Sequence, residues 1–263
     1  MTGGDASGEF YTGNLIGMLE LVWGEGWLSP GGPDEVAEVL KDLDLVGKSI
    51  LDIGCGTGGV DFLLVETFRA AHVTGIDVED TVLVTARGRA AAKNLSARVG
   101  FAKVWPGALP FPPAAFDIVF SKDAIVHIPD KHTLLRDVYR VLKPGGWFAA
   151  SDWLIGHDGE PSAAMRDYIE AEGLGFGMAS PERYRDALTQ AGFTGIAIRS
   201  RNDWYRQTAR QEVAAMKGPL RAKADAVLGP DFVGHNIAIW EKMIRVIDTG
   251  EHCPTHLRGR KPL

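Results

Sequence analysis

The chain has 263 residues, a net charge of −6 and two cysteines, Cys55 and Cys253. This length suits one large α/β domain or one domain with a sizeable appendage. The negative charge argues against a nucleic-acid partner, because binding to a phosphate backbone relies on clustered Lys and Arg. Two cysteines are too few for a disulfide framework, and neither an apolar leader nor a run of about 20 apolar residues occurs. We therefore expect a cytoplasmic protein without a membrane span.

The first part of the chain alternates short apolar runs with stretches that have helical spacing. Strands are predicted at residues 49–53, 72–76, 98–104, 116–121 and 147–151. Helices are predicted at residues 60–69, 81–92 and 133–142, and the last of them should be stopped by Pro144, Gly145 and Gly146. Strands that alternate with helices indicate a parallel sheet covered on both faces.

The pattern changes after Asp152. Helices are predicted at residues 160–172, 181–190, 207–217, 220–228 and 237–247, and strands at residues 193–198 and 255–259. We expect one integrated unit in three parts. These are an N-terminal lid segment (residues 1–34), a cofactor-binding core (35–155) and a substrate-side helical cover with the final strands of the sheet (156–263).

A glycine-rich turn follows the first predicted strand. Gly54, Gly56 and Gly59 match the pattern G-x-G-x-x-G, and Asp77 ends the second predicted strand. A carboxylate at that place can accept both hydroxyls of a ribose, although it could instead cap the next helix. The loop and this acid fit NAD as well as S-adenosylmethionine. Asp52 favours the latter, because a carboxylate just before the glycines suits a ligand with an ammonium and a sulfonium group better than a pyrophosphate.

Five motifs together resemble those of the class I S-adenosylmethionine-dependent methyltransferases. They lie at residues 51–59, 75–77, 109–111, 116–119 and 141–146, and the resemblance covers about residues 48–152. It implies an α/β fold with a Rossmann-like seven-stranded sheet, mostly parallel with an antiparallel last strand, and with helices on both faces. It also implies N-terminal lid helices, a helical cover inserted late in the chain, and S-adenosylmethionine as the cofactor.

A narrower resemblance to the phosphoethanolamine N-methyltransferases and related small-amine enzymes includes residues 11–12, 24–32 and 121–127. In that family a tyrosine and a histidine pair across the active site with the amine between them, and these positions are Tyr11 and His127. The cofactor contacts that the sequence and this resemblance together indicate are Trp27, Ser29, Gly31, Asp52, Gly54, Gly56, Asp77, Val78, Val104, Trp105, Lys122 and Asp123. The implied substrate contacts are Tyr11, His127, Trp153, Tyr168 and Glu172.

Two features depart from the narrower family. Trp105 stands where that family has an acidic residue at the adenine, and an indole could stack on adenine but cannot accept its hydrogen bond. Glu172 and Ala238 align with the Arg and Lys that grip a substrate phosphate there. Since a carboxylate repels a phosphate, the sequence argues against phosphoethanolamine and favours a zwitterionic or cationic metabolite.

His127 is the candidate base, because its ordinary pKa lies near neutrality and it follows the end of a predicted parallel strand. A structural role at the turn before Pro129 is the alternative. The leading hypothesis is N-methylation of a small-molecule amine. The other hypotheses are S-methylation of a small thioether or thiol such as an amino acid, a nicotinamide-dependent dehydrogenase and a non-catalytic binding protein. No metal site is expected, because five further histidines lack ligand spacing and are predicted at the surface or in loops, namely His132, His157, His235, His252 and His256.

Overall fold

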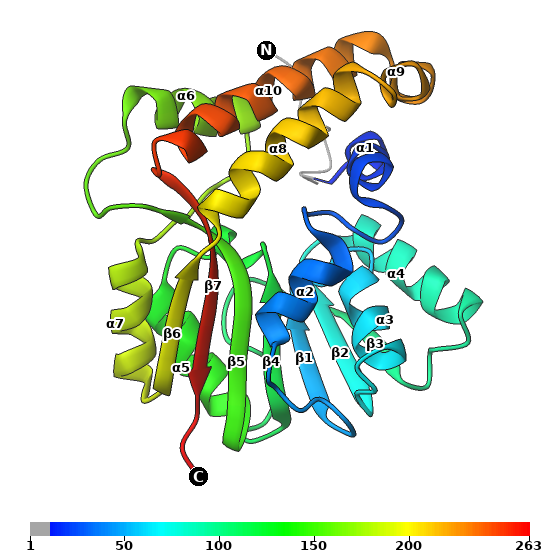
Figure 1. Cartoon of the computed structure of the whole chain (residues 1–263). Coiled ribbons are helices and arrows are strands. Elements are labelled where there is room, and N and C mark those ends of the chain that lie inside the picture. The colour runs from blue at the N-terminus through cyan, green and yellow to red at the C-terminus, as the bar shows by residue number, and fades with distance from the viewer. Residues whose placement is uncertain (1–10) are drawn as a thin grey trace.

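Residues 11–263, which a computed structural model describes, contain a seven-stranded sheet in the order β3-β2-β1-β4-β5-β7-β6 (Figure 1). Neighbouring strands among β1 to β5 pair in parallel, whereas β7 is antiparallel to both β5 and β6. The predicted fold class is therefore confirmed. The strands are β1 (Ser49–Ile53), β2 (His72–Asp77), β3 (Val99–Lys103), β4 (Phe116–Lys122), β5 (Leu142–Ile155), β6 (Thr194–Ser200) and β7 (His252–Arg260).

The sheet has a separate apolar core on each face, because neighbouring residues of a strand point to opposite sides. In β1, Ile50 packs in the cluster formed with α2 (Gly32–Leu40), α3 (Gly59–Glu66) and α4 (Asp80–Ala92). The next residue, Leu51, packs in the opposite cluster with α5 (Lys131–Val141) and α7 (Pro181–Ala191). Burial on both faces is why β1 reads as a continuous apolar run in the sequence.

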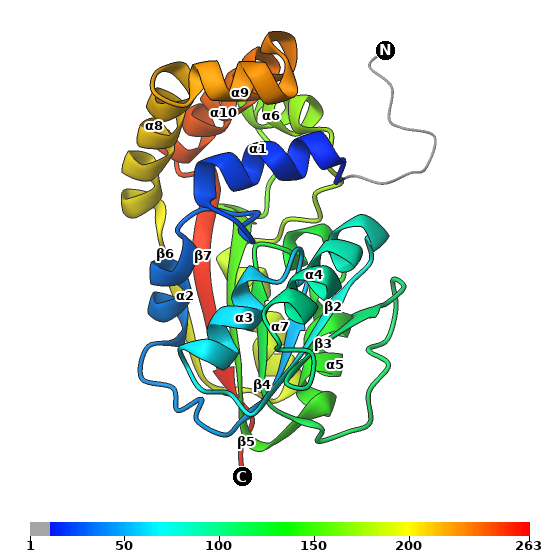
Figure 2. The same cartoon turned by 90° about the vertical axis from the view of Figure 1, so that its right-hand side faces the viewer.

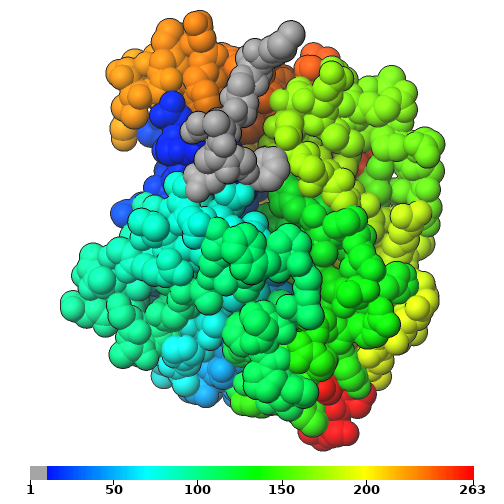
Figure 3. Space-filling model, turned by 180° about the vertical axis from the view of Figure 1, so that it is seen from behind, coloured from blue at the N-terminus to red at the C-terminus, as the bar shows by residue number. Residues whose placement is uncertain are grey.

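A layer of helices lies above the carboxyl ends of the parallel strands (Figures 1 and 2). We call this layer the helical cover; it consists of α1 (Gly13–Trp23), α6 (Ala163–Glu172), α8 (Asn202–Lys217), α9 (Arg221–Leu228) and α10 (Pro230–Asp248). Met18, Met165, Tyr205 and Trp240 are buried together in its core. Seen from behind, the yellow-green and orange segments of the cover lie at the end of the molecule opposite the red C-terminal residues (Figure 3). Among the described helices, none combines the length and the apolar character that a membrane crossing requires.

The start of β5 is a correction to the sequence-based boundaries. The strand begins at Leu142 rather than at residue 147, so the Pro144-Gly145-Gly146 segment lies within it instead of preceding it. The pairing with β4 shifts between Phe116 and Ile118 at this place, which marks a bulge. Glycine tolerates the unusual backbone of a bulge, and Gly145 indeed has a φ of 78°.

Two helices of the cover are longer than predicted. α8 begins at Asn202 rather than at residue 207, and α10 begins at Pro230 rather than at residue 237. A proline suits the first helical turn, since the N–H that it lacks would have no partner there. The segment 1–34 that the sequence predicts as a lid includes residues 1–10, which lie outside the described residues.

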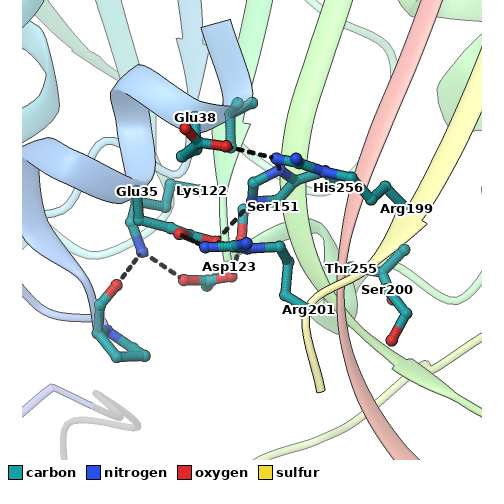
Figure 4. Close-up of polar contacts among 12 residues, drawn as sticks. Glu35, Glu38, Lys122, Asp123, Ser151, Arg199, Ser200, Arg201, Thr255 and His256 are labelled. Carbon is teal, nitrogen blue, oxygen red and sulfur yellow. Dashed lines mark hydrogen bonds and ion pairs between the residues drawn. The ribbon is translucent and has the colours of Figure 1, made fainter. Parts of the chain in front are cut away.

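A buried ion-pair network joins α2 to β7 and to the start of α8. Glu35 is 4% exposed and accepts hydrogen bonds from Arg201 at 2.9 and 2.7 Å and from Nε2 of His256 at 2.5 Å (Figure 4). Burial raises the pKa of Glu35, but the hydrogen bonds from His256 and Arg201 outweigh this and hold it at about 2. The predicted surface or loop position is wrong for His256 and for His252, which are 4% and 1% exposed because β7 lies inside the sheet.

Glu35→Gln is expected to destabilise the fold by about 3 kcal/mol near neutral pH, because a buried ion pair loses one charge. Because the pKa of Glu35 is lower in the folded protein than its ordinary value of 4.5, ionised Glu35 stabilises the fold at pH values above about 4.5. This stabilisation is lost as the pH falls toward about 2. Urea unfolding at about pH 7 and about pH 3 should therefore show a smaller difference between the two proteins in acid.

The matched control for this experiment is Glu38→Gln on the same helix. Its carboxylate pairs with Arg199 but is 41% exposed, so little change is expected. Equal stability of the wild type and Glu35→Gln near neutral pH would contradict the assignment.

Candidate functional site

The glycine loop connects β1 to α3 at the carboxyl edge of the sheet. Gly54 has a φ of 77°, and a Cβ at this position would collide with the Cβ of Ala124, so a side chain does not fit. Asp77, at the end of β2, accepts hydrogen bonds from the backbone N–H groups of Gly56 at 3.0 Å and Glu79 at 3.1 Å. Its carboxylate retains lone pairs for further donors. The N-cap of α4 is Glu79, so Asp77 does not take the capping position.

Two carboxyl groups are buried beside each other beneath this loop; they interact with one another, and no donor group of the described residues reaches any of their four oxygens. Asp52 lies in β1 and is 1% exposed, and Asp61 lies in the first turn of α3 and is fully buried. Burial raises the pKa of both groups, and the charge of Asp52 raises that of Asp61 further. Buried carboxylates are costly unless donors or a cation compensate them, so this pair fits a cationic ligand above the loop. Asp52 was predicted from the sequence as a cofactor contact, whereas Asp61 was not.

A small cavity of about 40 Å³ lies beside the loop, and its lining includes Trp27, Leu28, Ser29, Gly54 and Lys122. Leu28 packs on the loop so closely that a Cβ at Gly56 would lie 3.0 Å from its Cδ1. Sites for small molecules usually measure about 300 Å³ or more. Residues 26–29 therefore pack closely against the loop and leave little space there.

Glu20 of α1 links residues 26–29 to the glycine loop and to α4 through hydrogen bonds. Its carboxylate accepts hydrogen bonds from the N–H of Gly26 at 2.9 Å, the hydroxyl of Thr57 at 3.1 Å and the guanidinium of Arg89 at 2.6 Å. Hydrogen bonds from Arg89, Gly26 and Thr57 overcome the effect of partial burial and lower the pKa of Glu20. Glu20 and Arg89 are 69 positions apart, so no local pattern in the sequence could have paired them.

Lys122 forms hydrogen bonds to the next residues of the same segment, Ser29 and Pro30. Its buried ammonium donates to the hydroxyl of Ser29 at 2.7 Å, the carbonyl of Pro30 at 2.8 Å and the carboxylate of Asp123 at 2.6 Å (Figure 4). Asp123 has a left-handed φ of 57° and is held by hydrogen bonds to the backbone and side chain of Ser151. The predicted contacts Ser29, Lys122 and Asp123 are thus brought together beside the glycine loop.

His127 ends the short helix η1 (Ile125–His127), directly after β4. Its Nδ1 lies 2.9 Å from the carbonyl oxygen of Gly175, which can only accept, so Nδ1 carries the proton in the neutral ring. Nε2 is then left with a free lone pair. Burial lowers the pKa of His127 below 6.5, so the ring is mostly neutral near pH 7. This is the protonation state that a general base requires.

Tyr11 packs against apolar side chains of the helical cover and of the glycine-loop region. Burial raises its pKa, and the nearby carboxylates of Asp77 and Glu172 raise it further. The carboxylate of Asp77 also acts to raise the pKa of His127, so both Tyr11 and His127 lie near this carboxylate. Among the contacts of residues 11–263, no hydrogen bond joins Tyr11 to His127, and their predicted pairing across the substrate stays a prediction.

Three of the predicted substrate residues, His127, Trp153 and Tyr168, belong to a connected group of rings beneath the cover. Trp153 of β5 stacks on His252 with ring centroids 4.7 Å apart, and Tyr168 of α6 stacks on Phe176 at 6.0 Å. Phe176 in turn stacks on His127 at 5.7 Å. The sequence analysis did not identify Phe176 or His252 as part of the site, because a loop residue and a strand residue carry no local sign of this packing.

The remaining predicted cofactor contacts surround the loop and Asp77. Val78 is 47% exposed and Trp105 is 75% exposed, with the ammonium of Lys103 4.7 Å from the Trp105 ring centroid. The N–H of Val104 donates to the carbonyl of Asp77 at 2.9 Å. Gly31 has a φ of 88° at the start of α2, beside the ring of Trp204. Exposed apolar groups next to Asp77 suit the flat base of a nucleoside.

Comparison with known proteins agrees with this geometry. Residues 50–146 match the family described as "Methyltransferase domain". Phosphoethanolamine N-methyltransferase 1 of Arabidopsis thaliana is 34% identical over 204 residues, which are 77% of this chain and 40% of that protein. Phosphoethanolamine N-methyltransferase of Plasmodium falciparum is 27% identical over 77% of this chain and 75% of its own length. The chain thus spans about two fifths of the plant relative that it matches.

A solved structure is similar over most of the chain. It is phosphoethanolamine N-methyltransferase 2 of Haemonchus contortus in complex with phosphomonomethylethanolamine and S-adenosylhomocysteine. The TM-score is 0.86 at 26% sequence identity, and the match covers 94% of this chain and 57% of that one. The similarity therefore includes the helical cover as well as the sheet.

Asp77→Ala is expected to weaken the binding of S-adenosylmethionine by about 1–3 kcal/mol, because charge-assisted hydrogen bonds to the ribose are lost. Asp77→Asn, which retains one acceptor oxygen, should lose less. Isothermal titration calorimetry measures both affinities. Asp80→Ala serves as the control, since that carboxylate is 57% exposed and pairs with Lys103. Unchanged affinity in a folded Asp77→Ala protein would exclude Asp77 as a cofactor contact.

Proposed function

We propose that this chain, a class I S-adenosylmethionine-dependent methyltransferase, transfers the methyl group to the nitrogen of a small-molecule amine. The observation that carries the proposal is the state of His127, whose Nδ1 hydrogen-bonds the Gly175 carbonyl and leaves Nε2 free as a base. The relatives named above are amine N-methyltransferases, which agrees with a site that contains a base.

S-Adenosylmethionine, when bound, supplies a methyl group on a positively charged sulfur, and the protein contributes alignment, desolvation and deprotonation. An ammonium has no lone pair, so the substrate must first give a proton to Nε2 of His127. The free nitrogen lone pair then forms the new bond to the methyl carbon while the carbon–sulfur electron pair stays on sulfur. The His127 imidazolium later releases its proton to water.

The residues around the glycine loop would hold the cofactor for this step. Asp77 would accept the ribose hydroxyls, and the buried carboxyl groups of Asp52 and Asp61 would favour the positively charged amino acid end. The segment that Glu20 and Lys122 fasten over the loop would exclude water once it closes. Tyr11 lies near the carboxylate of Asp77, beside the glycine loop, and near that of Glu172 on α6.

The alternative functions receive no comparable support. A thioether has no proton to lose, so its S-methylation would not need the free Nε2 of His127; a thiol could use that base, but the relatives named above methylate nitrogen. A nicotinamide dinucleotide would place a pyrophosphate over Asp52 and Asp61, whose ionised forms repel phosphate oxygens.

His127→Ala is expected to lower kcat by about 10²–10⁴-fold, because the reaction loses its general base. In the wild type, kcat should rise with pH through an inflection below 6.5, as burial lowers the pKa of His127. The variant should lose that inflection and respond to higher pH only through the amine itself. Transfer of labelled methyl groups to a panel of small amines measures both rates.

His132→Ala provides the matched control, because this imidazole is 44% exposed and pairs only with Asp186 at 3.6 Å. It should leave the pH profile unchanged. A His127→Ala protein that retains the wild-type rate and pH profile would remove His127 from the mechanism.

A further inference from the structure

The inner face of α6 carries a carboxylate into the ring cluster beneath the cover. Met165, Tyr168 and Glu172 are spaced by three and four residues and so share one face of the helix. Met165 is fully buried and Tyr168 is 4% exposed, which shows that this face points inward. The charge of Glu172 raises the pKa of both Tyr168 and Tyr11, so the carboxylate lies near both phenols.

Glu172 has no hydrogen bond or ion pair among the contacts of residues 11–263. Burial alone raises its pKa to about 7, and no cationic side chain acts against this. The two buried lysines of the described residues have other partners. Lys122 donates to Asp123 at 2.6 Å, and Lys131 donates to the carbonyls of Ile125 and Ile128 at 2.6 Å each. The carboxylate of Glu172 can therefore still pair with a positively charged group of a ligand.

His252 offers a second unused acceptor in the same cluster. It is 1% exposed, its Nδ1 has no hydrogen-bond partner, and burial lowers its pKa to about 4. A histidine with that pKa is neutral near pH 7, so it does not repel a cation. Its ring stacks on Trp153 and lies 5.2 Å from the ring of Tyr168.

The ring cluster links this acceptor pair to the proposed base. His127 stacks on Phe176 at 5.7 Å, and Phe176 lies 6.0 Å from Tyr168 and 6.4 Å from His252. The faces of Tyr168 and Phe176 attract cations through their electron-rich rings. At one end of this region His127 would accept a proton from the reacting amine. At the other end lie the carboxylate of Glu172, the unpaired Nδ1 of His252 and the aromatic rings.

We infer that the substrate is an amine whose far end carries a second positive charge, such as a short aliphatic diamine, bound there by Glu172 and His252. This inference rests on the proposed N-methylation and names its substrate class. The near amine would lose its proton to His127, and the far ammonium would keep its protons and donate to the carboxylate of Glu172. A phosphate at the far end would meet the unpaired carboxylate and be repelled.

Three amines that differ mainly in the far end test this inference: 1,3-diaminopropane with an ammonium, ethanolamine with a hydroxyl, and phosphoethanolamine with a phosphate. For the wild type we expect kcat/KM to be at least about tenfold higher for the diamine than for ethanolamine, and lowest for phosphoethanolamine. Glu172→Gln should raise KM for the diamine by about tenfold with little change in kcat. The same substitution should leave ethanolamine nearly unaffected, which a general loss of structure would not do.

Glu170→Gln on the same helix is the matched control, because Glu170 is exposed and lies on the outer face. It should behave as the wild type with all three amines. Glu172→Arg should reverse the preference toward phosphoethanolamine, because a cation then faces the phosphate. Calorimetric titration of 1,3-diaminopropane in the presence of S-adenosylhomocysteine measures the same preference without turnover.

The outcomes separate the two proposals. If ethanolamine is methylated as well as the diamine and Glu172→Gln changes neither, the inference about the far end is wrong while N-methylation stands. If no amine is methylated but the diamine still binds in a Glu172-dependent way, the site for the far cation stands and the proposed reaction is wrong. A wild type that prefers phosphoethanolamine would overturn the inference outright.

Discussion

Carboxyl groups without an ion pair are the constraint on which the rest of this site depends. Asp52 and Asp61 lie side by side under the glycine loop with no basic side chain paired to them, and Glu172 on the inner face of α6 has no ion pair among the described residues either. Each is costly to the free protein, because burial penalises the charged form. A positively charged ligand would offset that cost. Ligand binding and fold stability should therefore be linked, since a ligand that binds only the folded state stabilises it.

The carboxyl groups without an ion pair fall into two parts of the site: a cofactor half with Asp52 and Asp61, and a proposed substrate half with Glu172. The cofactor half is built on β1, β2 and the loop between β1 and α3, where backbone geometry is tightly limited by Gly54. The substrate half is built from α6, the loop that contains Phe176, and β7. Glu172 itself stands on α6 of the cover, so a substitution at this position can change the preference without disturbing the sheet. Glu172 is the clearest place for such a change.

The N-terminal segment connects these halves. Glu20 and Lys122 hold residues 26–30 over the glycine loop through side-chain to backbone hydrogen bonds, and Leu28 fills the space above Gly56. In this position the segment shields the glycine loop from water. A closed, dry site strengthens every interaction between the ligand charges and the buried carboxylates.

The sequence alone determined the sheet, the glycine loop and the identity of Asp77 and His127 as candidate residues. These features are local: buried strands are continuous apolar runs, and the loop and its acid lie at fixed distances along the chain. Tertiary structure decided the rest. The pairing of Glu20 with Arg89, the burial of Asp61 and His252, and the position of Phe176 against His127 depend on segments far apart in sequence. Local patterns cannot show them, because each of these contacts joins segments that only the folded chain brings together.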